Sequence, residues 1–173
     1  GFFINEKIEN LLSLDSKSSI AKSTGLAIIL LSDAFSHIEP DVVLLLGDRF
    51  ETHAAATTAM LMNIPIAHIH GGEITEGAVD EKIRHSITKM SSLHFTSTGE
   101  YRDRVIQMGE SSDMVFLVGA PGIDNIVNMK LLDRNELESE LGWRINKPTA
   151  LFTYHSETLS TVEATDQIRK ILS

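Results

Sequence analysis

The chain has 173 residues, of which 42% are apolar and 23% are charged, as in ordinary soluble globular domains. Its net charge of −9 argues against a nucleic-acid-binding protein, which would show a basic face, and no long apolar run predicts a membrane span. The absence of cysteine excludes disulfides and thiolate metal sites and is typical of a cytoplasmic protein.

The first segment predicts no export signal. Residues 1–12, GFFINEKIENLL, contain acidic side chains and lack a small-residue cleavage site. The chain also begins without methionine, which is typical of a fragment of a longer protein.

Apolar runs alternate with helical stretches from this point onward. Helical spacing of apolar side chains predicts a long helix over residues 18–38, and the run DVVLLLG at 41–47 is typical of a strand buried on both faces. The later elements follow in the same alternation: helix 49–62, strand 64–68, helix 79–91, strand 93–96, helix 100–108 and strand 114–118.

This alternation predicts an α/β fold, a Rossmann-like parallel sheet with helices on both faces. We assign residues 1–122 to a partial N-terminal Rossmann-like domain and the charged, helical residues 123–147 to a linker. A new apolar strand, PTALFTY at 148–154, and a helix over 162–172 then follow. They either pack on the first sheet or, as we predict, begin at residue 148 a second Rossmann-like domain whose remainder is absent.

Polar residues follow three of the predicted strands. Their sequences are GDRFE at 47–51, HIHGGE at 68–73 and TYHSET at 153–158. Ligands of open α/β sheets bind beyond the carboxyl ends of the strands. We therefore expect residues 48, 70, 80 and 155 to converge on one pocket mouth.

In the first of these segments, Asp48 directly follows a buried strand and begins a helix. It is therefore either an N-cap that accepts hydrogen bonds from backbone N–H groups or an acid/base group at the floor of a cleft. Arg49 either orients a carboxylate or stays solvated.

In the second segment, His68 and His70 alternate along a strand and should point to one face. The Gly71-Gly72 pair allows a tight turn and the close approach of a ligand. Two imidazoles near Asp80 or Glu73 would also suit zinc, although acids and histidines in a cleft transfer protons without a metal.

The helix that follows carries two pairs of side chains spaced four residues apart, Asp80 with Arg84 and Glu81 with His85. Asp80 and Arg84 border the buried apolar stripe, so we expect them at a cleft edge. The alternative is a surface ion pair, with acids favoured by the helix dipole.

The third segment carries His155 before hydroxyl and acidic residues and a helix. A histidine and hydroxyls at the start of a helix suit a phosphate, and the alternative is a capping segment.

Four stretches together resemble the hydrolysing UDP-N-acetylglucosamine 2-epimerases, and more narrowly their sialic-acid-pathway branch. They are LGDRFE (46–51), HIHGGEITEGAVDEKIRHSITKMSSLHFTST (68–98), VGAPGIDN (118–125) and TYHSETLST (153–161). The resemblance extends over essentially the whole chain, and its second stretch is long and specific.

The resemblance implies two Rossmann-like domains facing each other across a cleft, an architecture similar to glycogen phosphorylase and glycosyltransferase B. It implies that UDP-N-acetylglucosamine and water become N-acetylmannosamine and UDP, for sialic acid biosynthesis. Anti elimination of UDP gives a 2-acetamidoglucal, which is then hydrated with inversion at C2. We accordingly expect a UDP-sugar substrate, a homodimer, no cofactor and no bound metal.

The resemblance also assigns roles to residues. Asp48 and Asp80 match family carboxylates with acid/base or sugar-binding roles, Arg84 supports the site, and His155 lies near the diphosphate. His70 stands where many relatives carry glutamate, so Glu73 is an alternative for that role. The predicted catalytic set is Asp48, His70, Glu73, Asp80 and Arg84, and the predicted substrate-binding set is Arg49, Gly71, Gly72, His85, His155, Glu157 and Thr158.

The chain lacks the family's N-terminal phosphate-side loop and most of its second domain, so we expect little turnover from the isolated chain. Three alternatives remain open. The first is an epimerase of a UDP-2,4-diacetamido sugar, the second a non-catalytic binding or assembly module. The third is a metal-dependent hydrolase built on His68, His70 and Asp80.

Overall fold

The computed structural model describes residues 3–12, 16–76, 79–146, 148–155 and 162–172. The chain divides into two compact units, residues 1–120 and residues 121–173, and each is described by itself. No helix among the described ranges is long and apolar enough to cross a membrane.

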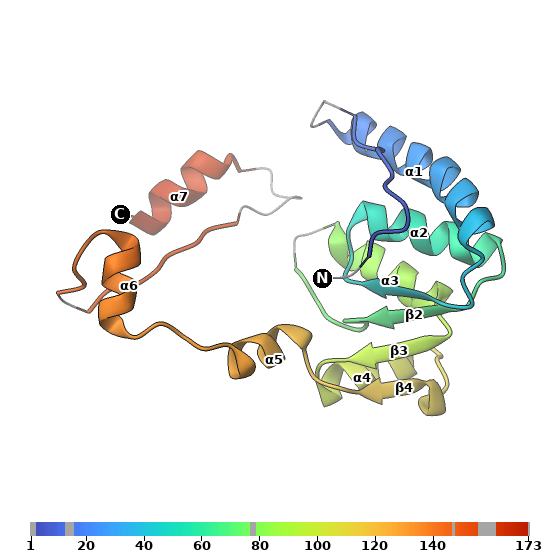
Figure 1. Cartoon of the computed structure of the whole chain (residues 1–173). Coiled ribbons are helices and arrows are strands. Elements are labelled where there is room, and N and C mark those ends of the chain that lie inside the picture. Colours follow the sequence, from blue (N-terminus) through green and yellow to red (C-terminus); the bar gives the residue numbers. More distant parts are fainter. Residues whose placement is uncertain (1–2, 13–15, 77–78, 147, 156–161, 173) are drawn as a thin grey trace. The chain divides into compact units, whose positions relative to one another are not determined.

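The first unit is a four-stranded parallel sheet with its helices, and it confirms the predicted α/β fold (Figure 1). Its elements are α1 (Lys17–Ile38), β1 (Val43–Leu46), α2 (Phe50–Leu61), β2 (Ile66–Ile69), α3 (Asp80–Met90), β3 (Leu93–Thr96), α4 (Gly99–Gln107), a 3₁₀ turn (Ser112–Met114) and β4 (Val115–Leu117). The strand order is β1-β2-β3-β4, the order of the sequence.

Local sequence signals explain where the helices begin and end. The Ser16 side chain accepts a hydrogen bond from the backbone N–H of Ser19 and caps α1, and Thr98 caps α4 in the same way. Helix α1 ends at Glu39, which has a left-handed backbone with φ of 50°.

The sheet has one covered face and one open face. Leu45 of β1 is in register with His68 of β2, and both side chains are buried on the face covered by α2 and α3. Leu44, Leu46 and Phe116 point the other way and are 62%, 57% and 42% exposed. Right-handed crossovers between strands in sequential order place their helices on one face, so the expectation of helices on both faces does not hold for the described residues.

The second unit contains three helices among its described residues: α5 (Pro121–Asn128), α6 (Arg134–Leu141) and α7 (Ala164–Leu172). A reciprocal capping box between Asp133 and Glu136 begins α6, and Gly142, with φ of 72°, ends it.

The strand expected at 148–154 is not formed in the described residues, and Leu151 is 96% exposed. An apolar segment becomes a strand only beside another strand that pairs with its backbone, and the described part of this unit contains none. The division of residues 121–173 into a linker and the start of a second domain stays a prediction.

Candidate active site at the carboxyl ends of the strands

The carboxyl ends of β1, β2 and β3 lie side by side because the three strands are parallel neighbours (Figure 1). Polar residues follow each end. A set of side chains from these segments and from α3, which we call the rim cluster, is joined by hydrogen bonds. Its members are Asp48, His70, Glu73, Thr75, Arg84 and Ser97.

Arg84 is the centre of the rim cluster. It is only 6% exposed, and its Nη2 donates to the carboxylate of Asp48. Its Nη1 donates to the backbone carbonyl of Glu73 at 2.9 Å, and both Nη atoms lie 3.1 Å from Thr75 Oγ1. Burial lowers the pKa of Arg84, although a guanidinium stays protonated in proteins. Its partner is thus Asp48, 36 residues away, so the alternative of a surface pair with Asp80 does not hold.

A second part of the rim cluster joins His70 to Glu73. The Nδ1 atom of His70 lies 2.6 Å from Glu73 Oε1, which also accepts a hydrogen bond from Ser97 Oγ at 2.7 Å. The two side chains are 23% and 26% exposed, so this pair is reachable from solvent. His70 has a left-handed backbone with φ of 68°, an uncommon conformation for a residue with a side chain.

The glycine pair lets this turn pack tightly on neighbouring helices. A Cβ on Gly72 would lie 2.4 Å from the carbonyl oxygen of Tyr101, and the residue has φ of 81°. A Cβ on Gly71 would meet Thr88 Oγ1 at 3.1 Å. Arg104 donates to the carbonyl of Gly72 and holds the turn against α4. The space at both glycines is filled by the protein, and their role in substrate binding stays a prediction.

His68 lies beneath the rim and is fully buried. Its Nε2 lies 2.9 Å from the carbonyl oxygen of Gly47, to which it donates, and its Nδ1 lies 3.3 Å from Thr88 Oγ1. Burial lowers the pKa of His68 to about 4, so the ring is neutral at pH 7. The residue connects the segment before Asp48 to α3.

The expectation that His68 and His70 share a face is wrong. Strand β2 ends at Ile69, and the left-handed backbone of His70 breaks the alternation of side chains. Within the described ranges, no three histidine or acidic side chains are placed to share a metal ion. The zinc arrangement of His68, His70 and Asp80 is therefore not formed.

Three further predicted residues, Arg49 before α2 and Asp80 and His85 on α3, are not among the members of the rim cluster. Asp80 is half-buried at the start of α3. Arg49 is mainly exposed and pairs with Glu51 at 3.2 Å, which raises the pKa of Arg49, with a smaller contribution from Asp80. The predicted pair of Glu81 and His85 is present at 3.8 Å, and burial lowers the pKa of His85.

The third predicted segment belongs to the second unit. His155 is exposed there, and Glu157 and Thr158 lie outside the described residues. The convergence of this segment with the rim cluster stays a prediction.

Two members of the rim cluster, Thr75 and Ser97, were not predicted. Ser97 directly follows the strand 93–96 that the sequence predicts, at the same edge of the sheet as Asp48 and His70. The rule that ligand groups follow the strand ends would therefore have identified Ser97. Thr75 carries no comparable signal.

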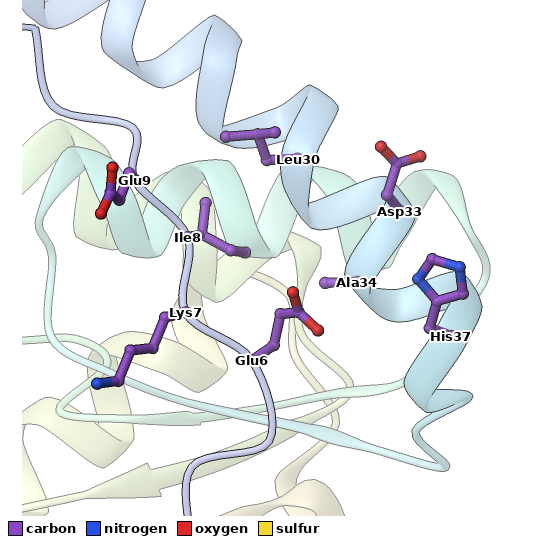
Figure 2. A pocket seen from close by; sticks show the side chains of 8 residues that line it. All are labelled: Glu6, Lys7, Ile8, Glu9, Leu30, Asp33, Ala34 and His37. Atoms are coloured by element: carbon purple, nitrogen blue, oxygen red, sulfur yellow. The ribbon is translucent and has the colours of Figure 1, made fainter.

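A hollow of about 420 Å³ lies elsewhere in the first unit, between the N-terminal segment and α1 (Figure 2). Ile8 is directed toward α1, where Leu30 and Ala34 lie. The other lining residues are Glu6, Lys7, Glu9, Asp33 and His37. Three of them are acidic and none belongs to the rim cluster, so the lining is unfavourable for an anionic ligand.

Comparison with known proteins gives a consistent result. The family model described as UDP-N-acetylglucosamine 2-epimerase matches residues 1–173. The chain is 43% identical over 171 residues to the GDP/UDP-N,N'-diacetylbacillosamine 2-epimerase (hydrolyzing) of Campylobacter jejuni. It is 42% identical over 172 residues to the polysialic acid biosynthesis protein P7 of Escherichia coli. Each alignment covers 99% of this chain and 44% of the relative, so the chain spans less than half the length of these proteins.

A solved structure shows the same likeness. The UDP-GlcNAc 2-epimerase of Neisseria meningitidis, crystallised with UDP-GlcNAc, matches with a TM-score of 0.62 and 28% identity over 66% of this chain and 32% of that chain. The predicted relation to a glycosyltransferase-B-like fold is thereby confirmed. Since the family model matches every residue, the chain belongs to the UDP-N-acetylglucosamine 2-epimerase family.

Proposed function

We propose that this chain is a segment of a hydrolysing 2-epimerase that converts UDP-N-acetylglucosamine and water into N-acetylmannosamine and UDP. The observation that carries the proposal is the rim cluster, in which groups able to transfer protons gather at the carboxyl ends of parallel strands. The polysialic acid relative supports a place in sialic acid biosynthesis.

The reaction needs two proton transfers at C2 of the sugar. In the first step a base removes the C2 proton, the C2–H electron pair forms the C1=C2 double bond, and the C1–O bond breaks so that UDP leaves. In the second step water adds its oxygen to C1, and a proton returns to C2 from the opposite face. Two acid/base groups are therefore required, each held in a fixed position.

The described residues offer candidates for both groups. We assign Asp48 as one of them, since Arg84 fixes its carboxylate at the end of β1. We assign Asp80 to a second acid/base or a sugar-binding role. Arg84 donates hydrogen bonds to the Asp48 carboxylate and to the Glu73 carbonyl, so we assign it the role of positioning these groups. His155 and helix N-termini would bind the diphosphate.

We also propose that the chain supplies only one wall of the cleft. In this view residues 1–122 belong to the N-terminal domain, residues 123–147 link the domains, and residues 148–173 begin the second domain. The 44% coverage of the relatives supports this placement. The longer protein would act as a cytoplasmic homodimer, and the isolated chain would have little turnover.

A second candidate substrate is a UDP-2,4-diacetamido sugar. The 43% identity to a hydrolysing diacetylbacillosamine epimerase favours it, because the two reactions share the same chemistry at C1 and C2. The candidates differ only in the substituent at C4 of the sugar.

The test is to incubate the full-length protein, and separately the 173-residue chain, with each of the two UDP sugars. UDP release and the NMR spectrum of the sugar product are then measured. We expect the full-length protein to release UDP and a sugar inverted at C2, with a preference for one substrate, and the isolated chain to release almost none. A full-length protein that releases no UDP from either sugar would refute the proposed function.

A further inference from the structure

The backbone of His70 is held in an unusual conformation at the end of β2. Its φ of 68° lies in the left-handed region, which costs a residue with a side chain about 1 kcal/mol or more. Its N–H donates to the carbonyl of Phe95 on β3 at 3.0 Å, so the conformation is fixed by the sheet. Such conformations concentrate at functional sites, where they direct a side chain away from the strand.

The partner of His70 determines which ring nitrogen carries the proton. A carboxylate can only accept a hydrogen bond, so the contact of 2.6 Å with Glu73 assigns the proton to Nδ1. In the neutral ring, Nε2 then has a free lone pair. No group in the described part of the chain forms a hydrogen bond with Nε2, and the side chain is 23% exposed.

Glu73 is itself held from two directions. Its Oε1 accepts a hydrogen bond from Ser97 Oγ at 2.7 Å, at the end of β3, and its backbone carbonyl accepts one from Arg84 Nη1 at 2.9 Å. The carboxylate is thus positioned by β3 and α3 together. A base that a third group orients in this way is the usual arrangement for proton transfer by histidine.

We propose that His70 and Glu73 form a dyad in which His70 Nε2 exchanges the C2 proton of the sugar. Glu73 is the positioning residue, and Ser97 orients Glu73. In the elimination step, the C2 proton moves to Nε2 and the C2–H electron pair forms the C1=C2 bond while UDP leaves with the C1–O electrons. The imidazolium is stabilised by the carboxylate of Glu73, and the proton leaves the ring to solvent. This inference rests on the proposed function.

The dyad and Asp48 together place one acid/base group at each of two neighbouring strand ends. Asp48 follows β1 and His70 follows β2, and Arg84 contacts both the Asp48 carboxylate and the Glu73 carbonyl. The two groups have different partners, since the Asp48 carboxylate pairs with the Arg84 guanidinium and the His70 ring pairs with the Glu73 carboxylate. They can therefore serve the two faces of the sugar as different partners, one for removal and one for return of the C2 proton.

Two replacements of His70 separate its chemistry from its backbone. Asparagine tolerates the left-handed conformation and keeps an N–H donor for Glu73, but it has no base at the position of Nε2. Glycine also accepts φ of 68° and leaves a space that free imidazole can enter. His37→Ala removes an exposed histidine of α1 and is the matched control.

The experiment measures UDP release by the full-length protein for His70→Asn, His70→Gly, Glu73→Gln and His37→Ala. We expect kcat to fall about 100- to 10,000-fold in both His70 variants with KM within about threefold of wild type. Added imidazole should raise the kcat of His70→Gly in proportion to the imidazole concentration. It should not raise the kcat of Glu73→Gln. The kcat of Glu73→Gln should be about 10- to 100-fold lower than that of the wild type, and the kcat of His37→Ala should be unchanged.

A spectroscopic measurement tests the dyad without reference to activity. Nitrogen-15 NMR of the His70 ring, assigned by its loss in His70→Asn, should show Nδ1 protonated in the wild type and a mixture of both neutral forms in Glu73→Gln. His70→Asn with wild-type kcat, a failure of imidazole to restore His70→Gly, or a ring protonated at Nε2 would each overturn the dyad. Wild-type protein that releases no UDP would overturn the proposed function instead, since the NMR result does not depend on turnover.

Discussion

Among the described residues of the first unit, two histidine–glutamate pairs have their histidine on or directly after neighbouring strands, and they differ in place rather than in chemistry. In the rim pair, His70 and Glu73 follow β2, 2.6 Å apart, and His70 is 23% exposed. In the interior pair, His94 of β3 and Glu110 lie 3.2 Å apart, and His94 is 1% exposed. The rim pair is therefore accessible to a substrate, whereas the interior pair contacts only other residues of the protein.

The interior pair takes part in hydrogen bonds that join neighbouring elements. Glu110, which follows α4, also accepts a hydrogen bond from Lys89 of α3, and Lys89 donates to the carbonyl of Met108. Burial lowers the pKa of His94, so the ring is neutral at pH 7. The group thus joins α3, β3 and the segment after α4. Variants of the rim cluster should change turnover, and variants of the interior pair should change stability.

The largest effect is expected from Asp48→Asn in the full-length protein. The amide keeps the shape of the side chain and an oxygen that accepts from Arg84, but it is not a base. We expect UDP release to slow by roughly two to four orders of magnitude. Thermal unfolding should shift by only a few degrees, and both quantities can be measured on the same preparation.

Wild-type turnover in Asp48→Asn would reduce Asp48 to the ion-pair partner of Arg84, since the N-cap of α2 is Arg49 and no side chain caps that helix. A large loss of stability together with a small loss of turnover would mean that the rim cluster, like the interior pair, is structural.

The second effect concerns the buried His68 and the dependence of stability on pH. Its folded-state pKa of about 4 lies below the value of 6.5 expected in the unfolded chain. Between these values the unfolded state binds a proton that the folded state excludes. The stabilisation is therefore complete above pH 6.5 and is lost as the pH falls toward 4, by about 3 kcal/mol in total.

His68→Gln retains an N–H donor for the carbonyl of Gly47 but does not titrate. Urea unfolding of both proteins at pH 7, 6, 5 and 4 should show a shallower loss of stability in the variant. Equal slopes for His68→Gln and wild type would contradict the assigned burial effect.

Much of the first unit could be predicted because its signals are local. The predicted strand 93–96 coincides with β3, and the predicted helix 18–38 begins one residue after the observed start of α1. The placement of Asp48 and His70 at one edge followed from parallel strands alone, whereas Arg84 was expected at a cleft edge from its place beside the apolar stripe of its helix. Such features depend on periodicity and chain direction, which the sequence carries directly.

The features that were missed depend on contacts between distant segments. The partner of Arg84 is Asp48 rather than Asp80 because the sheet brings the end of β1 next to α3. The segment 148–154 has the apolar pattern of a strand, but pattern alone supplies no neighbouring strand with which to pair. The left-handed backbone of His70 has no sequence signal, because glycine or asparagine usually marks such positions.

The third effect is expected at the turn that carries Glu73. Gly72→Ala forces a left-handed alanine and places its Cβ against the carbonyl of Tyr101. Gly119→Ala is the matched control, since Gly119 has φ of 83° but open space around it. We expect losses of about 2 kcal/mol or more at Gly72 and about 1 kcal/mol at Gly119, measured by urea unfolding. Turnover should fall with Gly72→Ala only, because the rim turn carries the carboxylate that orients His70.

The smallest effects are expected within the interior pair itself. Glu110→Ala leaves the buried Nε2 of His94 without its acceptor, which should reduce the free energy of unfolding by about 1–2 kcal/mol. Lys89→Ala removes the other partner of Glu110, but the lysine is 51% exposed, so the loss should stay below about 1 kcal/mol. Both variants should retain wild-type kcat and KM in the full-length protein, because neither side chain reaches the rim cluster. A fall in kcat without a fall in stability in Glu110→Ala would show that the interior pair communicates with the rim, and that accessibility alone does not divide the two histidine–glutamate pairs.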